Sequence, residues 1–148
     1  MRFARRLLSL VAPLAAMAVL ACGGGSDGGG DLRVEVREWS VVPARDEGSS
    51  GPFTIELVNQ GTRPHQLVIV KSDLPPGLLP TAGARVDETL VIVAGRIEPI
   101  AAGARETRTM ELTAGKYVLI CNVVEQPAGG PVQGHYQNGM AATFLIDQ

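Results

Sequence analysis

The chain has 148 residues, a length typical of one domain. Its charges nearly balance, with 13 Lys and Arg against 15 Asp and Glu, and basic residues form no long run, which argues against nucleic acid as a partner. Without residues 1–21, which hold three of the Arg, the balance is 10 basic to 15 acidic residues, a net charge of −5.

Residues 1–21 have the features of an export signal. A basic start (Arg2, Arg5 and Arg6) precedes 15 residues, 7–21, that are apolar apart from one serine. The segment ends at Ala21-Cys22-Gly23 and resembles the bacterial lipoprotein signal, in which the cysteine is acylated and becomes the new N-terminus. An ordinary cleaved signal is the alternative. A membrane-spanning helix is the third possibility, although 15 residues fall short of the roughly 18 that a span requires.

Residues 22–30 are mostly glycine and predict a flexible tether between a lipid on Cys22 and the folded domain, 31–148. This organisation predicts an exported protein that is lipid-anchored to the membrane on its extracytoplasmic side. Cys121 is then the single free thiol of the mature domain. A lone thiol in an exported protein is exposed to oxidation unless something occupies it, and a metal ion would do so.

The domain is predicted to form a series of short strands separated by turn residues. Apolar residues alternate with polar ones or form short runs, and a strong helical period is missing, which predicts an all-β fold. The expected architecture is a Greek-key sandwich or barrel of about seven or eight mostly antiparallel strands. Residues 72–85 hold three prolines and predict a long loop with one helical turn. The predicted strands lie near residues 32–37, 53–57, 67–70, 89–94, 110–112, 116–122 and 143–146.

The residues able to bind a soft metal are scarce. The chain has two histidines, His65 and His135, and Met140 follows the second by five positions. With Cys121 they make the ligand set of a blue-copper electron-transfer site, two His, one Cys and a weak Met. Each residue alone has an ordinary structural role in a turn, a strand or the core. Zinc also accepts two His and one Cys, so the residues by themselves leave both metals open.

Three segments resemble the cupredoxins, and among them the plastocyanin- and azurin-like copper proteins of bacteria. They are Gly-Thr-Arg-Pro-His-Gln-Leu-Val (61–68), Gly-Lys-Tyr-Val-Leu-Ile-Cys-Asn-Val (115–123) and Gly-His-Tyr-Gln-Asn-Gly-Met (134–140). The order His, Cys, His, Met is that of the family. The resemblance implies one mononuclear type-1 copper, with His65, Cys121 and His135 as equatorial ligands and Met140 as the axial one.

The connection between the second and third segments departs from the family pattern. Thirteen residues, 122–134, separate Cys121 from His135, where family members have only a few. The longer loop costs only about 1 kcal/mol of closure entropy, which a metal–thiolate site can outweigh. Gln66 and Asn122 are candidates for contacts behind the ligands. Tyr136, next to a ligand, is a candidate for a docking surface.

The resemblance implies a one-electron carrier in an extracytoplasmic respiratory or redox chain. Its expected partners are the membrane, through the lipid, and redox proteins, and the expected state is a monomer. The alternative is a copper chaperone or storage protein that delivers copper to a cuproenzyme. A third hypothesis is a sandwich module that binds no metal. An enzyme is not expected, because two histidines cannot build a second, catalytic copper centre.

Overall fold

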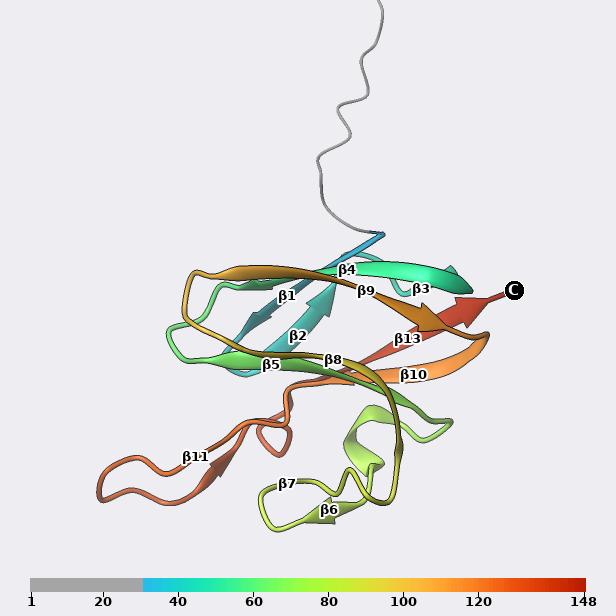
Figure 1. The fold of residues 1–148 in the computed structure, drawn as a ribbon. Coiled ribbons are helices and arrows are strands. Elements are labelled where there is room, and N and C mark those ends of the chain that lie inside the picture. The colour runs from blue at the N-terminus through green and yellow to red at the C-terminus, as the bar shows by residue number, and fades with distance from the viewer. Residues whose placement is uncertain (1–30) are drawn as a thin grey trace, which may run out of the picture.

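The computed structural model describes residues 31–148, which form two packed β-sheets (Figure 1). The predicted signal (1–21) and the tether with Cys22 (22–30) lie outside the described residues. In the described part, no helix has the length and apolar character needed to cross a membrane. The first sheet has the order β2-β1-β4-β9 and comprises β1 (Leu32–Arg37), β2 (Ser40–Pro43), β4 (Gly51–Asn59) and β9 (Arg105–Leu112).

The second sheet has the order β3-β13-β10-β5-β8. Its strands are β3 (Glu47–Ser49), β5 (His65–Lys71), β8 (Ile92–Ile100), β10 (Gly115–Ile120) and β13 (Ala141–Asp147). Two short hairpins lie beside the sandwich, one formed by β6 (Thr81–Ala82) and β7 (Arg85–Val86), the other by β11 (Val124–Glu125) and β12 (Gln133–Gly134). The latter is called the β11–β12 hairpin below.

The structure confirms the predicted all-β sandwich. Within the two sheets the pairs β1·β4 and β3·β13 are parallel, and the other pairs are antiparallel. The strand predicted at 89–94 was placed too early, because the Asp87 side chain accepts hydrogen bonds from the amide and hydroxyl of Thr89 and forms a turn there. The strand instead runs from Ile92 to Ile100.

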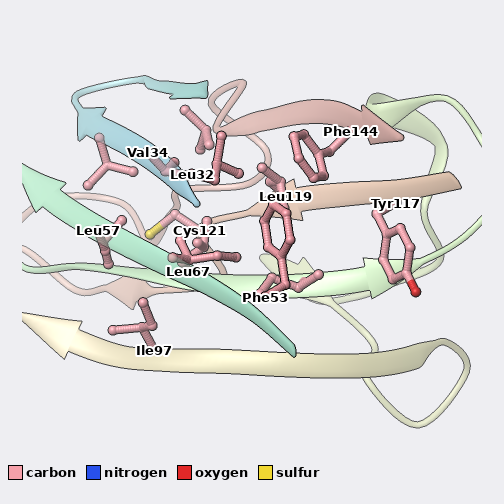
Figure 2. Close-up of a cluster of buried hydrophobic side chains, with 14 of the residues drawn as sticks. Leu32, Val34, Phe53, Leu57, Leu67, Ile97, Tyr117, Leu119, Cys121 and Phe144 are labelled. Atoms are coloured by element: carbon pink, nitrogen blue, oxygen red, sulfur yellow. The ribbon is translucent and has the colours of Figure 1, made fainter. Parts of the chain in front are cut away.

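The main core lies between the two sheets and comes from alternate positions of their strands (Figure 2). In β5, Leu67 and Ile69 face this core, and in β10, Tyr117 and Leu119 do so, followed by Cys121. Successive side chains of a strand point to opposite faces, so these odd-numbered residues share the inner face. Cys121, which directly follows β10, is therefore a core residue.

The intervening residues of β5 and β10 form a second buried cluster on the outer face of the sheet. The loop with the 3-10 turn η1 (Pro76–Leu78) covers this face, which explains why residues 67–70 of β5 and 117–120 of β10 form continuous buried runs instead of alternating with polar residues. Tyr136 belongs to this cluster: its hydroxyl donates to the Pro76 carbonyl (2.6 Å) and accepts from the Leu79 amide (3.0 Å). Tyr136 is buried, so its prediction as a docking residue was wrong.

Candidate metal centre

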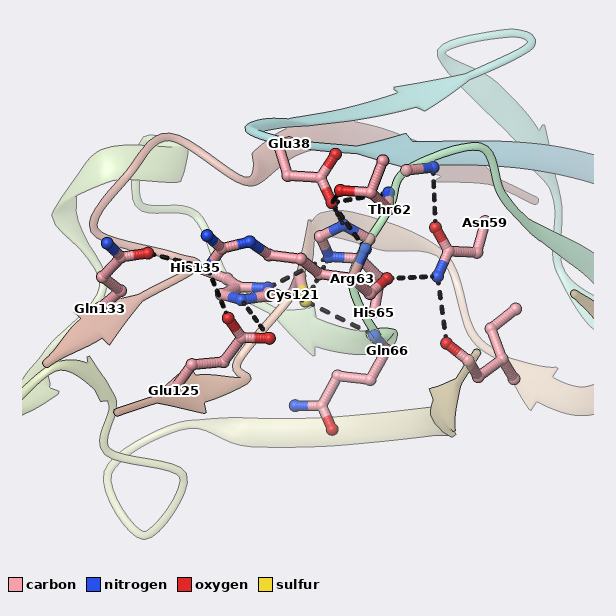
Figure 3. Close-up of polar contacts among 12 residues, drawn as sticks. Glu38, Asn59, Thr62, Arg63, His65, Gln66, Cys121, Glu125, Gln133 and His135 are labelled. Carbon is pink, nitrogen blue, oxygen red and sulfur yellow. Dashed lines mark hydrogen bonds and ion pairs between the residues drawn. The ribbon is translucent and has the colours of Figure 1, made fainter. Parts of the chain in front are cut away.

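The structure brings His65, Cys121 and His135 together at one end of the sandwich (Figure 3). His65 begins β5, Cys121 follows β10, and His135 follows β12. The Nδ1 atoms of the two histidines lie 3.1 Å apart, and the Sγ of Cys121 lies 3.6 Å from Nδ1 of His65 and 3.3 Å from Nδ1 of His135. All three side chains are fully buried.

The turn before His65 is built by Asn59, the last residue of β4. The Asn59 side chain is buried, donates to the carbonyls of Arg63 (2.7 Å) and Ile100 (3.0 Å), and accepts from the Gly61 amide (2.9 Å). Both polar atoms of the side chain therefore have hydrogen-bond partners, in the turn itself and at the end of β8. This turn fixes where the chain enters β5 and so where the His65 ring lies.

Glu38, just after β1, holds His65 from behind. Its Oε1 accepts hydrogen bonds from the amides of Thr62 and Arg63, both at 2.9 Å, and lies 3.2 Å from Nε2 of His65. Although burial opposes ionisation, these hydrogen bonds prevail and lower the pKa of Glu38 from 4.5 to about 2. Because an ionised carboxylate only accepts, Nε2 of His65 carries the proton and its Nδ1 lone pair faces Cys121.

The sulfur of Cys121 receives a hydrogen bond from the Gln66 amide at 3.4 Å. Burial raises the pKa of the Cys121 thiol, and backbone hydrogen bonds from Gln66 and Val123 oppose that rise only in part. Without a bound cation the thiol therefore stays protonated near neutral pH. The Gln66 amide would stabilise a Cys121 thiolate as well, because a hydrogen bond from an N–H group favours the charged form of sulfur.

His135 lies under the β11–β12 hairpin, and its amide donates to the Val123 carbonyl at 2.9 Å. Its ring meets the Trp39 ring edge-on, with centroids 5.1 Å apart. Its Nε2 lies 3.6 Å from Oε1 of Glu125. Burial lowers the pKa values of both His135 and His65, so both rings are neutral near pH 7.

The remaining predicted site residues lie close by. Met140 is fully buried; its amide donates to the His135 carbonyl (3.2 Å), and its carbonyl accepts from the Cys121 amide (3.1 Å). Gln66 is buried, and its amide is the group that contacts the sulfur. The Asn122 side chain turns to the loop covering the outer face, where it accepts from the Val86 amide (2.7 Å) and donates to the Val86 carbonyl (3.1 Å).

The donor atoms fit a single soft cation. His65 presents an Nδ1 lone pair, Nδ1 of His135 lies 3.1 Å from it, and the Cys121 sulfur lies 3.6 Å and 3.3 Å from these two nitrogens. A cation that displaced the thiol proton would be met by one thiolate and by two neutral imidazoles, each able to present an Nδ1 lone pair. One ion with bonds of about 2.0 to 2.3 Å would separate such donors by about 3.5 Å, close to what is observed.

Four residues that support the site were not identified from the sequence: Glu38, Asn59, Arg63 and Glu125. Each is an ordinary polar residue of a loop or strand end, and two of the contacts they make join segments far apart in the chain. Glu38 is 27 positions from His65, and Arg63 is 62 positions from Glu125. Only the position of Glu125 within the long connection 122–134, next to the ligands, hinted at such a role.

Comparison with known proteins establishes the fold. No family model and no curated protein matches the chain. Among solved structures, reduced auracyanin from Roseiflexus castenholzii matches with a TM-score of 0.51 and 21% identity, over 78% of this chain and 95% of that one. The azurin Az-iso2 from Methylomonas sp. strain J matches with a TM-score of 0.50 and 18% identity, over 78% and 96%.

Both neighbours are cupredoxins, so the chain has the cupredoxin fold, an all-β sandwich, and it carries a buried His-Cys-His group at one end. This confirms the fold that the resemblance of the three sequence segments implied. At these sequence identities the similarity shows the fold alone.

Proposed function

We propose that this protein holds one copper ion between His65, Cys121 and His135 and carries one electron at a time, as a type-1 (blue) copper protein. The observation that supports the proposal is the buried group of two imidazole nitrogens and one sulfur, whose atoms lie within 4.8 Å of one another. Two His and one Cys with a weak axial Met are the ligands of such centres. Met140 is the proposed axial ligand.

The protein holds the ligands in position and sets the hydrogen bonds and polarity around the ion. Bound copper supplies the one-electron couple. Glu38 holds His65 in the tautomer that presents Nδ1, and the Gln66 amide contacts the Cys121 sulfur. Because both contacts exist before an ion binds, the ligands need little rearrangement when the charge of the centre changes. Hydrogen bonds to the sulfur and the apolar surroundings then set the reduction potential.

Burial of the ligands favours an electron carrier over copper delivery. A chaperone must exchange ligands with its partner, which requires donor atoms at the surface. Here His65, Cys121 and His135 are all fully buried. A closed site supports a retained ion, and electrons, unlike copper, can pass through a thin layer of protein.

We further infer that the domain acts outside the cytoplasm, as a monomer, and is tied to the membrane by a lipid on Cys22. A tether of the length 22–30 would confine it near membrane-bound redox proteins and raise its local concentration without additional contacts. The support for export and for the lipid is the sequence of residues 1–30.

The test is to load the purified protein with Cu(II) and record visible and electron paramagnetic resonance spectra, with Cys121→Ser as the control. The expected result is an intense copper–thiolate band and a narrow copper hyperfine splitting, both lost in the control. A wild-type protein that stayed colourless with Cu(II), or that bound only Cu(I), would rule out the carrier. Copper delivery would then be the better proposal.

A further inference from the structure

Each ligand histidine has a carboxylate behind it, on the Nε2 side of the ring (Figure 3). For His65 the carboxylate is Glu38, and the contact of 3.2 Å is a hydrogen bond. For His135 it is Glu125, whose Oε1 lies 3.6 Å from Nε2, about 0.6 to 0.7 Å longer than a typical N–H···O bond. Within residues 31–148, Nε2 of His135 is the buried side-chain nitrogen that has no hydrogen-bond partner.

An unpaired nitrogen at this place matters for metal binding. A neutral histidine that binds an ion through Nδ1 carries its proton on Nε2. A buried N–H without an acceptor costs free energy, so it favours the other tautomer, whose proton on Nδ1 would block the ion. Histidine ligands in proteins usually donate this second N–H to a carboxylate or carbonyl. Glu125 is the carboxylate that faces it.

Glu125 is held in place from its other oxygen. Nη1 of Arg63 lies 2.6 Å from Oε2 of Glu125 and donates to Oε1 of Gln133 at 2.9 Å, so it binds both strands of the β11–β12 hairpin. The Arg63 guanidinium also lies over the Trp39 ring, 5.5 Å from its centroid. Because Arg63 occupies Oε2, Oε1 remains directed at His135.

We propose that Glu125 is a positioning residue for the ligand His135: its Oε1 accepts the Nε2 proton and keeps the Nδ1 lone pair available to the metal. Arg63 fixes Glu125 for this task, and the long connection 122–134 is what carries Glu125 to the ring. The inference rests on the proposed function only for the identity of the ion, because the tautomer of His135 is a property of the metal-free protein.

The pairing has an electrostatic consequence. Two carboxylates behind two ligands place negative charge near the ion and favour the more positive of two metal states. Removing the charge of Glu125 is therefore expected to raise the reduction potential of the loaded protein. This direction distinguishes an electrostatic partner of the site from a residue that only stabilises the loop.

The first measurement is nitrogen-15 NMR of the imidazoles of the metal-free protein near pH 8, where both are neutral. The chain has only two histidines, so the signals are simple to assign. In the wild type, both are expected to carry the proton on Nε2, and a wild-type His135 that instead donated an Nδ1 proton to His65 across 3.1 Å would overturn the proposal. In Glu125→Leu, His135 is expected to gain a large Nδ1–H population, while His65 stays unchanged as the internal control. Persistence of a pure Nε2–H tautomer at His135 would overturn the proposal.

The second measurement is Cu(II) affinity and reduction potential. Glu125→Leu is expected to weaken binding by about 10- to 100-fold. Glu125→Gln keeps an acceptor oxygen and is expected to recover most of that affinity, at a higher potential than wild type. Equal losses in the two variants would also overturn the proposal. Glu111→Gln is the matched control, because it removes an exposed carboxylate at the end of β9 that lies away from the candidate metal centre.

Two results keep the inference separate from the proposed function. If Glu125→Leu fails to fold, Arg63→Met provides the same test, because Glu125 then loses its anchor, and the NMR outcome decides as before. If the wild type binds no copper, the proposed function fails, yet the tautomer of His135 in the metal-free protein still decides the role of Glu125.

Discussion

Asn59, the last residue of β4, donates a 3.0 Å hydrogen bond to the carbonyl of Ile100, the last residue of β8. The two strands belong to different sheets, so this bond links the sheets at the end of the sandwich that holds the candidate metal centre. The same side chain closes the turn that leads to His65. Asn59 therefore couples the packing of the sandwich to the position of a ligand.

Asn59→Asp is expected to destabilise the metal-free protein by at least about 2 kcal/mol, because a carboxylate cannot donate to the carbonyls of Arg63 and Ile100 and would face both. Urea unfolding measures the change. Asn138→Asp makes the same chemical change at an exposed position and is expected to shift stability by less than about 0.5 kcal/mol. Equal unfolding midpoints for the two variants would contradict this role of Asn59.

Glu38 is expected to make stability fall in acid. Its pKa of about 2 in the folded protein lies below the ordinary 4.5, so between these values the unfolded chain binds more protons. The stability that Glu38 contributes is thus complete above about pH 4.5 and is lost as the pH falls toward about 2. Urea midpoints of the metal-free protein at several pH values measure this loss.

Glu38→Gln is the comparison for that pH series. Glu88 and Asp87 also have lowered pKa values, so both proteins are expected to lose stability in acid, and the difference between them reports Glu38. The variant is expected to be less stable at neutral pH and to lose less on acidification. Parallel curves for the two proteins would show that Glu38 does not titrate as the structure indicates.

Met140→Leu tests the axial ligand. The change conserves volume, so the fold is expected to lose less than about 1.5 kcal/mol. Leu puts hydrocarbon where a weak axial donor would be, and more apolar surroundings disfavour the more positive metal state, so voltammetry of the copper-loaded variant is expected to give a higher potential. Met110→Leu, at a partly buried methionine packed on the core outside the site, is the control. The same potential in both variants would refute an axial role for Met140.

Gly134→Ala tests whether the β11–β12 hairpin must sit closely on the protein. A Cβ at Gly134 would lie 1.6 Å from the carbonyl oxygen of Ala84, so backbone has to move. Because Gly134 directly precedes His135, we expect the ligand to shift, copper affinity to fall at least tenfold, and stability to drop by about 1 to 3 kcal/mol. Titration with copper and urea unfolding measure these effects.

Gly130→Ala is the matched control for that change. It lies in the same connection, but its Cβ would meet only atoms of Pro127, the nearest at 3.4 Å, an ordinary contact. Both affinity and stability are expected to stay near wild type. If Gly134→Ala behaved like Gly130→Ala, the hairpin would have room to adjust without moving His135.

Much of the sandwich could be predicted from the sequence because burial imposes a local pattern. Strands β1, β4, β5, β9 and β13 each contain a predicted segment, and β10 overlaps one, since their apolar positions match the face or faces they bury. The short strands β6, β7, β11 and β12 were not predicted. A two-residue strand has no pattern of its own and exists only where its partner lies.

The sequence by itself determined the His-Cys-His group, because the chain holds so few residues able to bind a soft metal and they follow the cupredoxin order. The tertiary structure alone decided what lies behind those residues. Glu38 and Glu125 are ordinary carboxylates in the sequence, and they gain a role only where folding directs them at Nε2 of a buried histidine. It also decided that residues 122–134 cover His135, since loop length sets how far a chain can reach but not where it packs.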